Sequence, residues 1–220
     1  MTKVPQPGFV KTRLRPFLSD DQCAELSACF LTDTVAKAMR VTPEVIVAYS
    51  ASGDGGAIFD LLPGSTICIE QHGKDLGERL VNAINFAESN GSGPVITIGT
   101  DSPTMPMELL ETSLQRLLEP ATELVLGGTE DGGYYLIGVK RNIPSIFQGI
   151  PWSSDRVYRA TLQQANQVGL TGIVELPTWY DVDKPDDLRR LFAEVDENVD
   201  ALSTSLETVR WIRANRKLFG

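Results

Sequence analysis

The sequence contains few residues that bind soft metals or form disulfides. Among its 220 residues are one histidine and three cysteines, with no Cys-x-x-Cys pair. An odd number of unpaired cysteines does not indicate a disulfide framework, and Cys23, Cys29 and Cys68 are expected to be small core residues. A zinc site is not indicated either. Any metal must be held by carboxylates, which favours Mg²⁺, Mn²⁺ or Ca²⁺.

Long hydrophobic runs are also lacking. No apolar stretch reaches the roughly 18 residues needed to cross a bilayer, so no membrane span is expected. The N-terminal sequence MTKVPQPGFVKTRLRP is basic, but it lacks the apolar core of a secretory signal. The two absences predict a cytoplasmic protein.

Positive charge is scarce. Lys and Arg total 20 against 29 Asp and Glu, giving a net charge of -9. A protein that binds duplex nucleic acid normally presents a basic face, so nucleic acid is not an expected partner. The N-terminal segment is a local exception, because Lys3, Lys11, Arg13 and Arg15 occur there without an acidic residue. A basic loop on an acidic protein favours a compact anion, such as a di- or triphosphate.

Helical and strand patterns alternate along most of the chain. Helices are expected over about 19–40, 75–90, 106–119, 154–169, 185–195 and 203–217, and strands over 44–50, 66–70, 94–100, 123–128, 134–139 and 172–176. The strand at 94–100 is a continuous apolar run, typical of a strand covered on both faces. The alternation predicts one α/β domain over residues 1–220, with a mostly parallel, doubly wound sheet and a C-terminal helical tail at 197–220.

The N-terminal basic segment contains the motif PQPGFVKTRL at residues 5–14. Gly8 would let backbone amides approach an anion, and the alternation of Lys11 and Arg13 places both side chains on one side of an extended stretch. A solvated basic turn is the alternative. No strand precedes the motif, although in doubly wound folds such a loop follows the first, central strand.

Two further motifs carry carboxylates. Asp101 in GTDSP follows the strand at 94–100, where ligands collect in open α/β sheets, and it suits Mg²⁺. Asp183 in DVDKPDDL would be a second metal ligand; Asp181 alternates with it, so only one of the two faces a given site. Helix capping is the alternative for both Asp101 and Asp183.

The motif EDGGYY at residues 130–135 contains a tight glycine turn. Asp131 is a candidate general base or acceptor-binding group. The alternative is an ordinary Asp-Gly hairpin turn.

The order of the motifs makes a resemblance visible. PxPGxVKTRL, QxGxDLGERL, GTDSP, EDGGYYLIG, WSSDxV and DVDxPDDL follow one another over residues 2–192. With these motifs the chain resembles the glycosyltransferase-like family of bacterial radical-SAM/selenodomain-associated transferases, in the nucleotide-diphospho-sugar transferase (GT-A) superfamily. It is more distantly similar to 2-phospho-lactate guanylyltransferase. The resemblance implies a three-layer α/β/α fold that binds a nucleoside phosphate.

The resemblance also implies residue roles. Lys11 and Arg13, with Gly8, match the phosphate-binding loop, while Asp101 and Asp183 match metal-binding positions. The remaining matches are Gln71 and Gly77 in a segment near the base, and Asp131, Tyr134 and Trp152 on the acceptor side. Lys184 stands where relatives usually have threonine.

A second departure from the family concerns the N-terminus. Relatives begin with an apolar strand before the equivalent of Lys3, so the usual first strand is expected to be missing here. A central strand buries several side chains worth about 1.5–3 kcal/mol each, so a start codon assigned too late is the more economical explanation.

These observations predict a metal-dependent transferase that uses a nucleotide-activated donor and an unknown small-molecule acceptor. Mg²⁺ or Mn²⁺ on Asp101 and Asp183 would bridge phosphate oxygens, Lys11 and Arg13 would stabilise the same phosphates, and Asp131 would orient or deprotonate the acceptor. With a nucleotide-sugar the enzyme is glycosyltransferase-like. The alternatives are a nucleotidyltransferase that releases pyrophosphate from a nucleoside triphosphate, and a non-catalytic nucleotide-binding module, which the missing strand favours.

Overall fold

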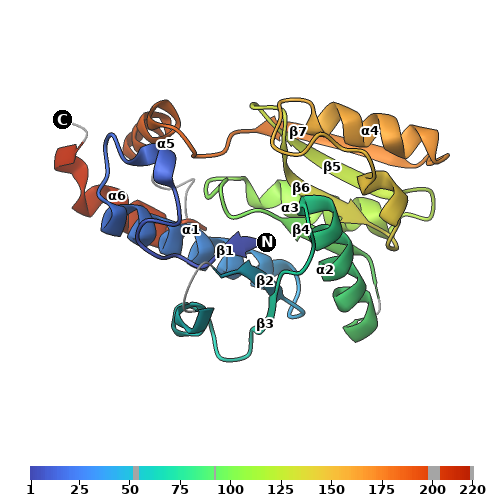
Figure 1. Cartoon of the computed structure of the whole chain (residues 1–220), viewed down its shortest axis with the longest axis horizontal. Coiled ribbons are helices and arrows are strands. Elements are labelled where there is room, and N and C mark those ends of the chain that lie inside the picture. The colour runs from blue at the N-terminus through green and yellow to red at the C-terminus, as the bar shows by residue number, and fades with distance from the viewer. Residues whose placement is uncertain (52–54, 92, 198–203, 219–220) are drawn as a thin grey trace. The chain divides into compact units, whose positions relative to one another are not determined.

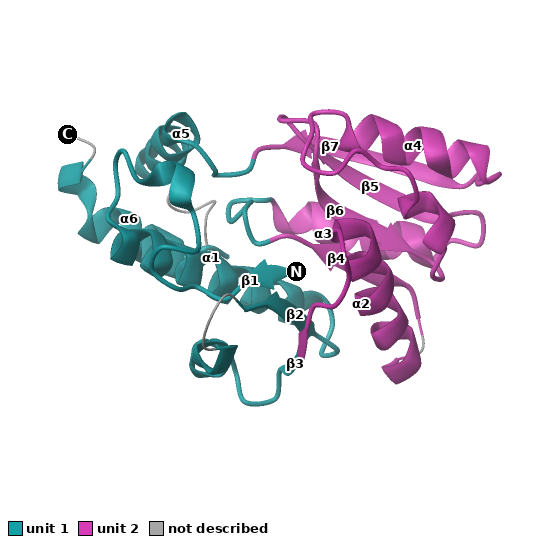
Figure 2. Cartoon of the chain, viewed as in Figure 1, with its two compact units in different colours: residues 1–68, 100–105, 181–220 teal, residues 69–99, 106–180 magenta. Residues whose placement is uncertain are grey.

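The computed structural model describes residues 1–51, 55–91, 93–197 and 204–218 (Figure 1). Its contacts divide the chain into two compact units (Figure 2). Unit 1 comprises Met1–Cys68, Thr100–Met105 and Asp181–Gly220, and unit 2 comprises Ile69–Gly99 and Pro106–Tyr180. The single domain expected over residues 1–220 stays a prediction.

Unit 1 contains a three-stranded sheet in the order β1-β2-β3. The strands are β1 (Thr2–Lys3), β2 (Ile46–Ser50) and β3 (Ile67–Glu70), in which the chain passes into unit 2. The helices are α1 (Asp20–Val41), α5 (Pro185–Glu197) and α6 (Leu206–Ala214), with 3-10 turns η1 (Thr12–Leu14), η2 (Gly55–Leu61) and η4 (Arg216–Leu218). α1 contacts both α6 and η1, and α5 contacts η1 and α6.

The expectation of a missing first strand is corrected by β1. Thr2 lies opposite Tyr49 in a parallel pair with β2, and the Val4 amide donates to the Ser50 carbonyl at 3.0 Å. Val4 is buried beside Val47 of β2. The pairing cannot continue far beyond Val4, because Pro5 has no amide proton to donate. Pairing with β2 and burial of one valine are therefore enough to form a strand where the sequence offers no long apolar run.

Helix α1 begins at the predicted capping box. The Gln22 amide donates to Ser19 Oγ at 3.2 Å, and the Ser19 amide donates to Gln22 Oε1 at 2.9 Å. The core of unit 1 forms between α1 and the sheet, where Leu31 and Val35 pack with Val47 and Ile58. In the predicted tail of residues 197–220, α6 and η4 are helical, while 198–203 and 219–220 lie outside the described residues.

Unit 2 contains a four-stranded sheet in the order β4-β6-β5-β7. Its elements are α2 (Leu76–Asn90), β4 (Val95–Ile98), α3 (Met107–Leu118), β5 (Leu124–Thr129), β6 (Tyr134–Val139), η3 (Pro144–Phe147), α4 (Val157–Gln167) and β7 (Ile173–Trp179). β5 and β7 pair in parallel, as β1 and β2 do in unit 1. β6 runs antiparallel to both of its neighbours, β4 and β5. Its direction is opposite to that of β5 because only a short turn connects the two strands.

Two local expectations in unit 2 need correction. The residues of β4 are only half-buried, because β4 stands at the end of the strand order, whereas most of β5 is buried. Helix α4 begins at Val157 rather than at Ser154. The hydroxyl of Ser154 donates to the Pro151 carbonyl at 2.7 Å, and it accepts from the Arg156 amide at 3.3 Å, so it stabilises the turn before the helix.

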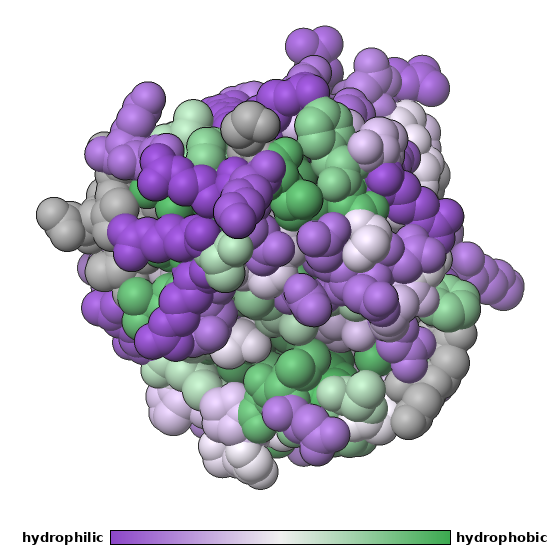
Figure 3. Space-filling model, turned by 90° about the vertical axis from the view of Figure 1, so that its left-hand side faces the viewer, coloured by the Kyte–Doolittle hydropathy of each residue, from purple (hydrophilic) through white to green (hydrophobic). Residues whose placement is uncertain are grey.

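The α/β class is confirmed. No helix among the described residues is both long and apolar enough to cross a membrane. The face drawn in Figure 3 is mostly hydrophilic, with hydrophobic side chains gathered in smaller areas.

Candidate functional site

Lys11 is the centre of a charged cluster in unit 1. Its side chain is 5% exposed, and its Nζ donates to Asp183 Oδ1 at 2.9 Å, to the Val182 carbonyl at 2.8 Å and to Asp101 Oδ1. Arg13 is largely exposed, with Nη1 at 3.9 Å from Asp183 Oδ2. The structure therefore brings together four residues that the sequence assigned to phosphate and metal binding.

The backbone of the glycine loop is unusual at two positions. Lys11 has φ 48° and ψ 32°, a left-handed conformation that is uncommon for a residue with a side chain. Such a conformation costs on the order of 1–3 kcal/mol and persists where the surroundings determine it, often at functional sites. Gly8 has φ 84°, and its carbonyl accepts from Arg15 Nη2 at 3.0 Å. The role of Gly8 in anion binding stays a prediction.

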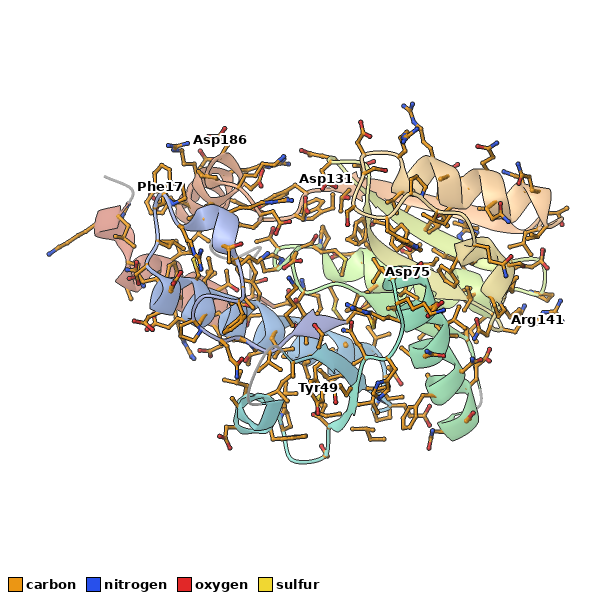
Figure 4. The ribbon with its side chains drawn as sticks, in the orientation of Figure 1. Phe17, Tyr49, Asp75, Asp131, Arg141 and Asp186 are labelled. Carbon is orange, nitrogen blue, oxygen red and sulfur yellow. The ribbon has the colours of Figure 1, made fainter. Side chains whose placement is uncertain are left out.

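Neighbouring elements hold this loop. The Lys11 ammonium lies 5.3 Å from the ring centroid of Phe30 on α1. On the other side, the guanidinium of Arg189 in α5 lies 4.4 Å from the ring of Phe17, and Arg189 also pairs with Asp186. Figure 4 labels Phe17 and Asp186 at this junction. Lys11 is thus supported by α1, and the end of its loop is supported by α5.

The two aspartates are joined through the backbone as well as through Lys11. The Val182 amide donates to the Asp101 carbonyl at 2.8 Å, so the GTDSP and DVD segments lie side by side. The capping alternatives are not supported. The Asp187 carboxylate accepts from the amides of Asp183 and Lys184, the two residues before α5, so the capping carboxylate there is Asp187 and not Asp183. Helix α3 has Pro106 at its N-cap without a side-chain bond.

The charges of the cluster stabilise one another. Burial alone would lower the pKa of Lys11, but Asp101 and Asp183 outweigh it and the pKa lies above its usual value. Burial alone would raise the pKa of Asp183, but the Lys11 ammonium outweighs it and the pKa lies below its usual value. Both groups are therefore charged at neutral pH.

The oxygen atoms of this cluster suit a hard divalent cation. No group of three His, Cys, Asp or Glu among the described residues is arranged to hold a metal ion. Asp101 and Asp183 nevertheless turn carboxylate oxygens toward a single cationic nitrogen, and the Asp101 side chain is 52% exposed. Mg²⁺ and Mn²⁺ are commonly held by one or two carboxylates, with waters and phosphate oxygens completing the shell. The residues present fit such an ion.

Asp131 lies in unit 2, at the turn between β5 and β6 (Figure 4). Its Oδ1 accepts from the Thr129 hydroxyl at 2.6 Å and from the Gly133 amide at 3.1 Å, bonds that support the hairpin-turn alternative. Gly132 has φ 91°, and the Tyr158 amide donates to its carbonyl at 2.9 Å. The EDGG turn is therefore fixed against the start of α4, and a chemical role for Asp131 stays a prediction.

Gln71 and Gly77 also belong to unit 2. Gly77 is buried in the first turn of α2, where a Cβ atom would lie 2.8 Å from Cζ2 of Trp152. The glycine is needed so that the tryptophan of the WSSD motif can pack on α2. This packing explains the glycine without a ligand, and the assignment of Gln71 and Gly77 to nucleotide binding remains a prediction.

Sequence reasoning missed two residues close to the cluster. Lys37 of α1 donates to the carbonyls of Pro103 and Met105, and Ser205 donates to the Pro103 carbonyl at 2.6 Å. Lys37 lies seven residues after Phe30, on the buried face of α1. A lysine on the buried face of a helix must have hydrogen-bond partners, and this was the signal in the sequence that could have identified Lys37.

Comparison with known proteins identifies the family. A family model described as uncharacterized protein conserved in bacteria (DUF2064) matches residues 32–154. The chain belongs to this family. No curated protein matches it. A protein from Desulfovibrio desulfuricans G20, provisionally named a nucleotide-diphospho-sugar transferase, has 32% sequence identity to this chain. Its crystal structure matches this chain with a TM-score of 0.88, over 99% of this chain and 93% of that one.

Two more solved structures share the fold at low identity. A cytidylyltransferase from Leptospira borgpetersenii serovar Hardjo-bovis (strain JB197) is 11% identical, with a TM-score of 0.55 over 99% of this chain and 93% of that one. The CMP:2-keto-3-deoxy-manno-octonic acid synthetase, complexed with CTP, is 14% identical, with a TM-score of 0.54 over 76% of this chain and 88% of that one. The DUF2064 chain therefore has a fold similar to that of a nucleotide-diphospho-sugar transferase and of cytidylyltransferases.

Proposed function

We propose that this DUF2064 protein is a metal-dependent transferase that binds the phosphates of a nucleotide-activated donor at Lys11, Arg13, Asp101 and Asp183. The convergence of Asp101 and Asp183 on Lys11 carries the proposal, because it joins two carboxylates and a phosphate-binding cation within one unit. The likeness to a nucleotide-diphospho-sugar transferase supports it.

Each residue has a role that follows from its chemistry. Asp101 and Asp183 would hold Mg²⁺ or Mn²⁺, which when bound would neutralise negative charge on phosphate oxygens. Arg13, exposed at the edge of the cluster, would donate to the same oxygens from the loop side. Lys11 keeps the two aspartates together and supplies a second cation. Asp131 would orient or deprotonate the acceptor, as the sequence predicts.

The proposal is tested first through binding. A ligand that binds only the folded state raises the unfolding temperature, so nucleotides and nucleotide-sugars can be screened by thermal shift with and without Mg²⁺. We expect a shift that needs both nucleotide and metal, and we expect Asp101→Asn to lose it. Asp60→Asn is the control, since it removes an exposed carboxylate from η2 in the same unit. An Asp101→Asn variant with the full metal-dependent shift would contradict the assignment.

The products separate the two catalytic alternatives. A glycosyltransferase breaks the sugar–phosphate bond and releases a nucleoside diphosphate, whereas a nucleotidyltransferase is attacked at the α-phosphorus and releases pyrophosphate. The similarity to cytidylyltransferases favours the second alternative, and the similarity to a nucleotide-diphospho-sugar transferase favours the first. Assaying both products with the donor found in the thermal-shift screen distinguishes them. Donor binding without release of either product, across a panel of hydroxyl acceptors, would favour the non-catalytic module.

A further inference from the structure

Two buried side chains from other parts of unit 1 donate hydrogen bonds to the backbone of the segment Thr100–Met105, which carries Asp101. Lys37 is 2% exposed, and its Nζ donates to the Pro103 carbonyl at 3.0 Å and to the Met105 carbonyl. Ser205 is 1% exposed, and its hydroxyl donates to the same Pro103 carbonyl at 2.6 Å. A buried ammonium is costly unless it is hydrogen-bonded, so these contacts favour one position of the segment.

The hydroxyl of Ser205 is used in an uncommon way. Ser205 occupies the N-cap of α6, where a serine normally accepts from the amides of its own helix, yet it makes no such bond. Asp33 of α1 replaces it: its carboxylate accepts from the amides of Glu207 at 3.0 Å and of Thr208 at 2.8 Å. Asp33 thus caps α6 from another helix and leaves Ser205 to bind the Asp101 segment.

The position of Asp101 depends on such backbone contacts. Its side chain is 52% exposed, so packing does not fix it. Its carbonyl accepts from the Val182 amide, and two residues further on the Pro103 carbonyl is held by Lys37 and Ser205. Moving Pro103 would therefore move Asp101 relative to Asp183.

We propose that Lys37 and Ser205 are positioning residues for the metal-binding carboxylate, and that α6, capped by Asp33, is the element that places Ser205. The consequence for metal affinity rests on the proposed function, whereas the effect on the backbone does not. Partners one step removed from a ligand typically change metal affinity by about 10–100-fold. We expect the loss of the Ser205 hydroxyl to have an effect near the lower end of that range.

The test compares Ser205→Ala with Ser113→Ala in the full chain. Ser113 is a matched control: it is equally buried, and its hydroxyl donates to a backbone carbonyl at 2.7 Å, but inside its own helix α3 in unit 2. The first measurement is hydrogen exchange of the Val182 amide, which reports its bond to the Asp101 carbonyl. The second is binding of Mn²⁺ alone, followed by the paramagnetic resonance signal of the free ion.

We expect Ser205→Ala to exchange the Val182 amide about tenfold faster and to bind Mn²⁺ about tenfold more weakly, whereas Ser113→Ala changes neither. Ser205→Thr, which keeps a hydroxyl, should recover at least part of both losses. Unchanged exchange in Ser205→Ala overturns the inference, and so does faster exchange with unchanged Mn²⁺ affinity. A wild-type chain that binds no Mn²⁺ instead contradicts the proposed metal site, while the exchange rates still decide whether Ser205 holds the backbone.

Discussion

At the scale of single residues, Lys11 carries the strongest prediction about stability. The pKa of Asp183 lies below its usual 3.8, so the stability from its ionised form is present above that value and is lost as the pH falls through the lowered pKa. The pKa of Lys11 lies above its usual 10.5, so its contribution is present below that value and is lost as the pH rises through the raised pKa. Their mutual stabilisation is therefore greatest between about pH 4 and pH 10.

Lys11→Met should lower the free energy of unfolding by about 1–3 kcal/mol at neutral pH. The loss stays below that of a fully buried pair because the Asp101 side chain is 52% exposed and its attraction is screened. Denaturant unfolding of both proteins across the pH range measures the difference, which should shrink toward both extremes. Lys74→Met, at an exposed position, serves as the control. A difference that does not vary with pH would contradict the ion-pair explanation.

At the scale of structural elements, the turn between β5 and β6 depends on Gly132. Its φ of 91° disfavours any side chain, and a Cβ atom would lie 2.0 Å from the carbonyl oxygen of Asp155. We expect Gly132→Ala to lower the free energy of unfolding by about 2–4 kcal/mol, since both the turn and the neighbouring segment must move.

Thermal unfolding followed by circular dichroism measures this change. Gly93→Ala is the matched control in the same unit, because a Cβ atom there meets nothing within 4 Å. The control should stay within about 0.5 kcal/mol of the wild type. Equal effects of the two substitutions would argue against a special role for the turn.

Local sequence patterns predicted where helices begin better than they predicted which residues far apart in the chain contact each other. The box formed by Ser19 and Gln22 predicted the start of α1, and Asp75 is the N-cap of α2 as expected. β1 was missed because it is only two residues long and is recognisable only by pairing with β2. The same limit applies to the candidate site. Lys11, Asp101 and Asp183 were found from motifs. Ser205 was missed, because it lies inside the helix expected over 203–217 and its contact with Pro103 is visible only in the structure.

At the scale of the whole molecule, the net charge of -9 contrasts with the cations near the N-terminus. A polymeric polyanion meets the repulsive field of the whole protein, whereas a compact polyphosphate is bound mainly by the groups it touches. The hydrophilic face in Figure 3 does not distinguish these ligands, because hydropathy carries no sign of charge. Binding measurements can.

We therefore expect inorganic tripolyphosphate with Mg²⁺ to raise the unfolding temperature, and duplex DNA at the same salt concentration to leave it unchanged. Tripolyphosphate is the sharper probe, since it carries the phosphates without a base or a sugar. Arg13→Ala should weaken its binding by about tenfold, or about 1.4 kcal/mol, because an exposed guanidinium beside Asp183 is lost. Arg210→Ala, which removes an equally exposed guanidinium on α6, should have little effect. The difference between the variants should diminish with added salt, and equal affinities at low salt would show that the phosphates bind elsewhere.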